Sequence, residues 1–264
     1  PGAHWEVPRL IPTKDGRNYL KLAGEDGVRC WRMMTRIGES QSCKSLQEAA
    51  DPAARLRMAA EAGRGLALFG ALTSGMDASR LRRTLPGYRD TPLYYAQLDS
   101  VLHGSRTLSD AAPFLPADPG VRESTQEHFL VRAEEQAFRL RLADPRVRRS
   151  ICLALEYRSF AQTLCRALES GNLKTVTVHG DPKLENFLFD SRTGGVKSLV
   201  DLDTVMPHTW WSDWGDMARS LVNQAGETET DLGRVGADPE IFRAAAGGFL
   251  AAARHVPGGE AALM

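Results

Sequence analysis

Hydrophobic and polar positions change their period along the chain, and this change divides it into regions. Residues 5–13 and 28–34 show the short apolar pattern of two strands, and the turn residues between them predict a hairpin connection. Residues 37–45 are polar and predict a linker. After this linker the pattern becomes helical, with apolar residues spaced three or four apart over 53–72.

Further helices are predicted over residues 92–103, 123–142 and 150–169, with stops at Gly75 and Gly171 for the first and last of the helical segments. Three strands follow at 175–178, 187–189 and 196–201, and a helix is expected from Asp213 to about Gln224. Strands, then helices, then a small hairpin set among helices indicate an α+β fold rather than alternating βαβ units.

Composition and charge exclude some function classes. The 264 residues include 33 Lys+Arg and 33 Asp+Glu, so the formal net charge is +0 and no nucleic-acid partner is expected. No apolar run approaches the roughly 20 residues that span a bilayer, so no membrane partner is expected either. The four cysteines lack metal-binding spacing and predict reduced thiols in a cytoplasmic protein.

One segment, VTVHGDPKLENFLFD followed by SLVDLD, has the residue types that phosphoryl transfer needs. A strand leads into His179-Gly180-Asp181, Asn186 follows five residues after Asp181, and Asp201 ends a later apolar strand. A carboxylate can accept a hydroxyl proton, while an amide oxygen and a second carboxylate can hold Mg²⁺ against phosphates. His-Gly-Asp alone could be an ordinary tight turn. The spacing to Asn186 and Asp201 favours the kinase interpretation.

HGDPKLENFLF, VDLD and DWGDMAR resemble the aminoglycoside phosphotransferase and choline kinase superfamily, which has a protein-kinase-like fold. Within it, TLPGYRDTPLYYAQL and VDLDTVMPHTWWSDWGDMARS resemble the N-acetylhexosamine 1-kinase branch. The resemblance implies a kinase that uses ATP and Mg²⁺. Asp181 would be the catalytic base, Asn186 and Asp201 the Mg²⁺ ligands, and His179 a support for the loop, while Lys183 could face the transferring phosphoryl group.

Three further positions extend this expected site. Asp203 lies two residues past Asp201 and would point to the same side if the strand continued, so it could be another metal ligand. By resemblance, residues 34–40, with Met34 and Ile37, would form the hinge that binds the adenine of ATP.

Several residues keep alternative interpretations. Asp213 and Asp216 suit the start of a helix, but one of them could instead contact a sugar hydroxyl or stabilise the catalytic loop. Trp211 and its neighbours could stack on a sugar or pack in the core. Arg89 and Tyr94, in the segment with the branch resemblance, could contact substrate or form a turn. His208 could be an exposed loop residue or shape the acceptor pocket.

No Gly-rich loop or suitable lysine precedes the hinge, because Lys14 and Lys21 lie beyond the expected place. We therefore expect residues 1–45 to be the last part of the small lobe and 46–264 the C-terminal lobe, with the rest of the small lobe absent and activity of this chain alone reduced. The first hypothesis is a kinase that phosphorylates a sugar hydroxyl, by preference the anomeric hydroxyl of an N-acetylhexosamine. An aminoglycoside or amino-alcohol kinase and a non-catalytic kinase-like module are the alternatives, and the oligomeric state stays open.

Overall fold

The computed structural model describes residues 5–25, 27–226, 228–254 and 256, and they form two compact units. The first unit comprises the described parts of 1–76, 177–203 and 212–264, and the second comprises 77–176 and 204–211. Elements up to residue 76 are β1 (Leu20–Gly24), β2 (Gly27–Trp31), β3 (Ser40–Gln41), η1 (Leu46–Glu48) and α1 (Pro52–Thr73). Elements after residue 175 are β4 (Val176–Val178), η4 (Leu184–Asn186), β5 (Phe187–Asp190), β6 (Val196–Leu199), η5 (Leu202–Thr204), β7 (Met206–His208), α9 (Trp210–Val222), η6 (Leu232–Arg234) and α10 (Pro239–Ala252).

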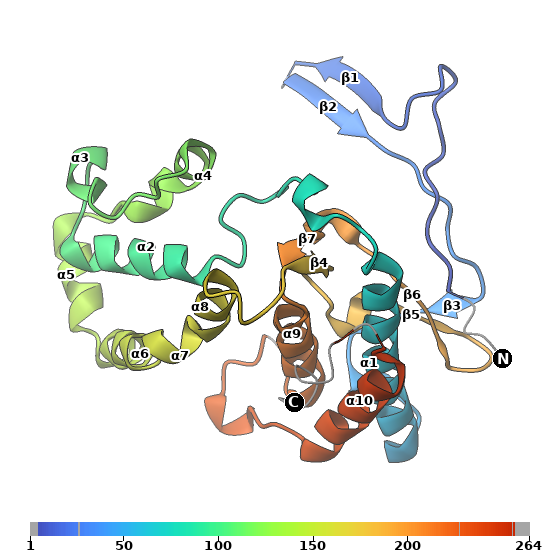
Figure 1. Ribbon diagram of the computed structural model, residues 1–264. Helices are drawn as coiled ribbons and strands as arrows, with labels where there is room; N and C mark the ends of the chain where they lie inside the picture. Colours follow the sequence, from blue (N-terminus) through green and yellow to red (C-terminus); the bar gives the residue numbers. More distant parts are fainter. Residues whose placement is uncertain (1–4, 26, 227, 255, 257–264) are drawn as a thin grey trace. The chain divides into compact units, whose positions relative to one another are not determined.

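The N-terminal hairpin lies later in the sequence than the hydrophobic pattern predicts. β1 and β2 pair antiparallel from Leu20↔Trp31 to Gly24↔Gly27, and all their residues are exposed (Figure 1). The prediction of a strand over 5–13 is wrong: the segment forms an isolated bridge, Leu10↔Met34, and the Glu6 N–H donates to the Lys197 carbonyl at 2.9 Å. A turn in which the Thr13 N–H donates to the Arg17 carbonyl at 2.8 Å redirects the chain before β1 begins.

A three-stranded sheet, in the order β3-β5-β6, belongs to the first unit. β5 and β6 are the antiparallel hairpin that the sequence predicts, paired from Phe187↔Leu199. Residues 37–45, expected to be a polar linker, include a short strand that the sequence did not predict, because Ser40 and Gln41 form β3 opposite Asp190 and Phe189. The buried rings of Phe187 and Phe189 make this sheet part of the core.

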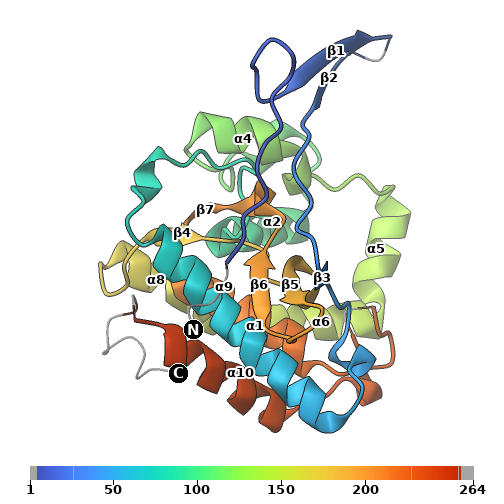
Figure 2. The same cartoon turned by 90° about the vertical axis from the view of Figure 1, so that its right-hand side faces the viewer.

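Helices α1 and α10 lie side by side in both views (Figure 1 and Figure 2). Asp51 caps α1 by accepting the Ala54 N–H at 2.7 Å, and the helix over 53–72 is confirmed. The two backbones approach closely at glycines: a Cβ on Gly63 would lie 2.0 Å from the Ala245 carbonyl oxygen, and one on Gly248 would lie 1.9 Å from that of Ala60. Only glycine fits at these two positions.

The second unit is mostly helical. Its elements, apart from β7, are η2 (Ala78–Arg80), α2 (Thr91–His103), α3 (Leu108–Ala111), α4 (Pro119–Thr125), η3 (Gln126–Phe129), α5 (Glu135–Ala143), α6 (Pro145–Glu156), α7 (Arg158–Ala161) and α8 (Thr163–Glu169). The helix expected over 92–103 is confirmed. No helix among the described residues is both long and apolar enough to cross a bilayer.

Two long helices predicted in this unit are each divided in the structure. The segment 123–142 breaks after α4, because Phe129 is fully buried and Val131 donates its N–H to the Ser105 carbonyl at 2.8 Å instead of continuing a helix. The segment 150–169 begins earlier, at Pro145, and is interrupted at Tyr157 and Gln162. Helical period alone did not reveal the break near Phe129, since that break depends on contacts with distant residues such as Ser105.

Candidate active site

A buried carboxylate of α9 accepts hydrogen bonds from the backbone of the His-Gly-Asp loop. Asp213, which is 2% exposed, accepts the N–H of His179 at 2.6 Å and that of Gly180 at 2.9 Å. Gly180 has a φ of +88°, a conformation that glycine adopts without the strain of a Cβ. Because two backbone donors meet one carboxylate, the loop is fixed immediately before Asp181.

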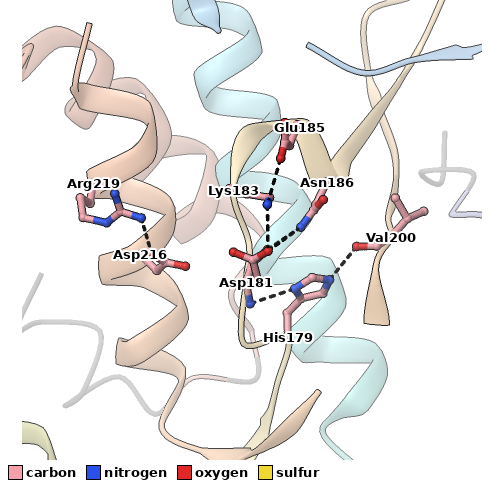
Figure 3. A network of polar contacts seen from close by, with 8 residues as sticks. All are labelled: His179, Asp181, Lys183, Glu185, Asn186, Val200, Asp216 and Arg219. Carbon is pink, nitrogen blue, oxygen red and sulfur yellow. Dashed lines mark hydrogen bonds and ion pairs between the residues drawn. The ribbon is translucent and has the colours of Figure 1, made fainter. Parts of the chain in front are cut away.

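The His179 ring joins this loop to the end of β6 (Figure 3). Its Nδ1 accepts the Asp181 N–H at 3.3 Å, so Nε2 carries the proton that is donated to the Val200 carbonyl at 2.9 Å. The ring is fully buried and meets Phe69 edge-on at 5.5 Å. This geometry agrees with the expected supporting role of His179. The ring binds the carbonyl of Val200, and Asp201 is the next residue in the chain.

Asn186 positions Asp181 from the other side of the loop. Its Nδ2 donates to the Asp181 carbonyl at 2.7 Å and to Asp181 Oδ2 at 3.3 Å. In addition, the Val200 N–H donates to the Asn186 carbonyl at 2.9 Å. Asp181, Asn186 and the residue before Asp201 are therefore joined by direct hydrogen bonds.

Lys183 places a positive charge beside the half-buried Asp181 carboxylate. Its Nζ lies 2.9 Å from Glu185 Oε1 and 3.3 Å from Asp181 Oδ2 (Figure 3). Hydrogen bonds to Glu185, and then to Asp181, raise the pKa of Lys183 above its usual range. The ammonium therefore stays protonated at neutral pH and can stabilise developing negative charge near Asp181.

The strand that leads to Asp201 ends earlier than the sequence predicts. β6 stops at Leu199, Asp201 has a left-handed φ of +66°, and the next three residues form a 3-10 turn. The strand does not continue, so the condition under which Asp203 would point to the same side as Asp201 is not met. Instead, the Asp203 carboxylate forms an ion pair with Arg32. Metal binding by Asp203 stays a prediction.

Asp213 does not cap its helix. The helix expected to start at Asp213 starts at Trp210, so the capping interpretation is wrong, and the carboxylate binds the His-Gly-Asp loop instead. One turn later, Asp216 pairs with Arg219 at 2.9 Å on the same helix. Trp214 packs against Phe249 with ring centroids 5.2 Å apart, which makes it a core residue.

The comparison with protein families agrees with this geometry. The family described as "Phosphotransferase enzyme family" (APH) matches residues 2–248. The chain belongs to this phosphotransferase family. Membership confirms the α+β, protein-kinase-like fold and identifies a phosphotransferase that acts on hydroxyl groups of small molecules. The N-acetylhexosamine branch and the nucleotide and metal that the enzyme uses stay predictions.

Ile37 and Met34, the two residues named for the expected hinge, differ in solvent exposure. Ile37 is 6% exposed, so its side chain belongs to the core, while Met34 is 46% exposed and its backbone bridges Leu10. The Ser40 hydroxyl donates to the Ile37 carbonyl at 2.9 Å, which fixes the backbone of this stretch. Adenine binding here stays a prediction for the backbone of residues 34–40.

In the second unit, the segment with the branch resemblance begins α2. Asp90 accepts the Leu93 N–H at 3.0 Å as the helix cap, and the Tyr94 hydroxyl accepts the Arg89 N–H at 2.8 Å. Arg89 has a φ of +57°, which is unusual for a residue with a long side chain. These contacts explain the segment as a turn before a helix, and substrate contact stays a prediction.

His208 and Trp211, the two remaining candidates of the second unit, are buried and half-buried respectively. His208 is 7% exposed, so its interpretation as an exposed loop residue is wrong. Burial, and then the charges of Arg89 and Arg83, lower the pKa of His208, while its Nδ1 accepts the Thr209 N–H at 2.9 Å. Trp211 is half-buried and stacks on Trp210 with centroids 4.2 Å apart.

Sequence reasoning missed the roles of Arg32 and Glu185. Glu185 lies inside the HGDPKLEN motif, and its spacing of two from Lys183 was the available signal. Arg32 gave no local signal, because its partner Asp203 is distant in the sequence.

Proposed function

We propose that this phosphotransferase transfers the γ-phosphoryl group of ATP, with Mg²⁺, to a sugar hydroxyl, and that the preferred acceptor is the anomeric hydroxyl of an N-acetylhexosamine. The observation that supports transfer is the loop geometry. Asp213 and His179 fix the backbone around Asp181, and Asn186 binds the same residue. A site fixed by so many bonds before substrate arrives is suited to positioning, which is the main contribution of proteins to phosphoryl transfer.

In the proposed reaction, Asp181 accepts the proton of the acceptor hydroxyl. The acceptor oxygen forms its bond to the γ-phosphorus while the bond from that phosphorus to the bridging oxygen breaks, so ADP leaves with the electron pair. Lys183, already held beside Asp181, offsets the negative charge on the transferring group. Asn186 keeps the Asp181 backbone in place during transfer.

The donor set fits Mg²⁺. Because Asn186 Nδ2 is the atom that donates to Asp181, its Oδ1 is the atom available to a cation, and Asp201 adds an exposed carboxylate. Among the described residues, no group of three or more His, Cys, Asp and Glu could hold a metal. Mg²⁺ commonly takes one or two protein carboxylates together with substrate phosphates. When bound here, it would neutralise phosphate charge.

Ion pairs at two glutamates of the helical unit favour a sugar over a polycationic aminoglycoside. Polycation sites are expected to show unpaired carboxylates. In this unit Glu127 pairs with Arg132 at 2.6 Å, and Glu135 pairs with Arg106 at 2.8 Å and Arg139 at 2.5 Å. Arginines thus already neutralise these carboxylates, and the resemblance of residues 84–95 adds support for a hexosamine.

An acceptor panel tests the proposal. Purified protein is incubated with ATP and Mg²⁺ and with N-acetylglucosamine, N-acetylgalactosamine, kanamycin or choline, and ³¹P NMR identifies the product and the phosphorylated position. We expect a hexosamine 1-phosphate and a loss of about 10²–10⁴-fold in kcat for Asp181→Asn, the usual contribution of a general base.

Asp118→Asn is the matched control, since Asp118 caps α4 and asparagine caps equally well. This variant should keep the wild-type rate. Faster transfer to kanamycin or choline than to either hexosamine would overturn the proposed acceptor. Transfer to none of them, with the protein folded, would favour the non-catalytic module.

A further inference from the structure

A pocket of about 320 Å³ lies in the first unit beside the catalytic loop. Its walls come from three parts of the chain: Lys44–Gln47 with η1, Lys183–Glu185 of the loop, and the end of α9 with the residues that follow it. None of the three parts was singled out from the sequence as a wall of an acceptor site. Resting on the proposed function, we propose that this pocket binds the ring of the acceptor sugar.

The lining combines an apolar floor with polar groups. Leu46, Leu184, Leu221 and Ile241 are all buried and contribute apolar surface to the pocket. Small-molecule pockets typically join such surface to a few well-placed polar groups. A sugar ring matches this combination, because its C–H face is apolar and its hydroxyls need hydrogen-bond partners.

Part of the polar lining shapes the wall. Asn223 Nδ2 donates to the Gly226 carbonyl at 2.9 Å, and Gln224 Nε2 donates to Asp238 at 2.6 Å. Asp238 in turn caps α10. These bonds fix the segment after α9, so that this wall is formed before a ligand binds.

Other polar groups of the lining can serve a ligand. Lys44 and Gln47 present an ammonium and an amide, and Ser220 and Thr228 present hydroxyls from the opposite wall. Hydroxyls and amides both donate and accept, which suits a ligand with several hydroxyls.

The pocket is joined to the catalytic base through one side chain. Lys183 lines the pocket, and its ammonium contacts both Glu185 on the wall and Asp181. A ring held against Glu185 and Lys183 can extend one hydroxyl beside the ammonium to Asp181, as proton transfer to this base requires. This proximity favours the acceptor over a distant effector as the occupant of the pocket.

Charge and size select the class of acceptor. The charged residues of the wall are Lys44, Lys183 and Glu185, so the lining does not attract a polycation. The volume is near the lower end of ligand pockets, which begin at about 300 Å³, and suits one monosaccharide better than a ligand of several rings.

The test fills the pocket from α9. Ser220→Leu adds a branched side chain at a partly buried position of the lining. Arg243→Leu introduces the same residue type at an exposed position of α10 outside the lining. We expect Ser220→Leu to raise KM for N-acetylglucosamine at least tenfold, to leave KM for ATP within twofold, and to weaken N-acetylglucosamine signals in saturation-transfer NMR. Arg243→Leu should match the wild type. Gln47→Leu, on the other wall, repeats the test if Ser220→Leu does not fold.

The outcomes separate the two proposals. Unchanged acceptor KM and NMR signals in both Ser220→Leu and Gln47→Leu overturn the pocket while leaving the proposed function intact. A rise in KM for ATP alone also overturns it, because the pocket then holds the nucleotide. Wild-type protein that neither phosphorylates nor binds any hexosamine refutes the proposed function and this inference together.

Discussion

Asp213→Asn is the substitution that most directly tests how the catalytic loop is held. The buried carboxylate accepts two backbone N–H groups, from His179 at 2.6 Å and Gly180 at 2.9 Å. Asparagine keeps one acceptor oxygen but turns an NH₂ toward the other donor. One charge-assisted bond is therefore lost, and such bonds contribute about 1.5–3 kcal/mol. We expect the free energy of unfolding to fall by about 2 kcal/mol.

The kinetic effect should exceed what this loss of stability explains. Asp181 follows Gly180 directly, and a displacement of about 1 Å at a reacting group can lower the rate by about 10²-fold. We expect kcat for Asp213→Asn to fall between about tenfold and 10²-fold at a temperature where the variant is folded, with KM for ATP little changed.

The assay combines steady-state kinetics with thermal unfolding of the same preparation. Asp51→Asn is the control, because Asp51 caps α1 and asparagine is an equally good cap, so neither the thermal midpoint nor kcat should change. If Asp213→Asn is folded and keeps the wild-type kcat, the loop does not depend on this carboxylate and the reasoning is refuted.

Two further predictions concern packing and pH. Gly248→Ala should destabilise the protein by about 1–3 kcal/mol, because the new Cβ would meet the Ala60 carbonyl. Gly247→Ala, whose Cβ would meet no described atom within 4 Å, should instead stabilise the protein by about 0.5–1 kcal/mol. Equal thermal midpoints for the two variants would contradict the close helix contact. The lowered pKa of His208 means that its contribution to stability is present above the unfolded value of about 6.5 and is lost as the pH falls through the lower folded value. His208→Gln should therefore reduce the fall in thermal midpoint on acidification below about pH 6.5, while the exposed His128→Gln should not; the wild-type slope in both variants would contradict the burial argument.

Local signals predicted much of the fold. The helical apolar period over 53–72 predicted α1, and the apolar segments 187–189 and 196–201 predicted the β5–β6 hairpin. Such features depend on residues a few positions apart, so the sequence contains all the partners. Breaks such as the one at Phe129 depend on burial against distant residues, and a periodic pattern does not contain that information.

The site divides in the same way. The spacing of Asp181 and Asn186 predicted that they act together, and in the structure one short loop brings them into direct contact. Asp213 is a residue type that often caps helices, so the sequence favoured capping. Only the structure showed that its carboxylate accepts the His179 and Gly180 N–H groups.

The sequence by itself thus determined the phosphotransferase family and the position of the His179–Asn186 loop in the chain, since both are encoded in contiguous motifs. Tertiary structure alone decided where the strand before Asp201 ends, that Asp203 pairs with Arg32, and which walls form the pocket beside Lys183. These features depend on segments that are far apart in the chain and meet only when the core packs. Their geometry is therefore a property of the folded protein, which no local pattern of residues specifies.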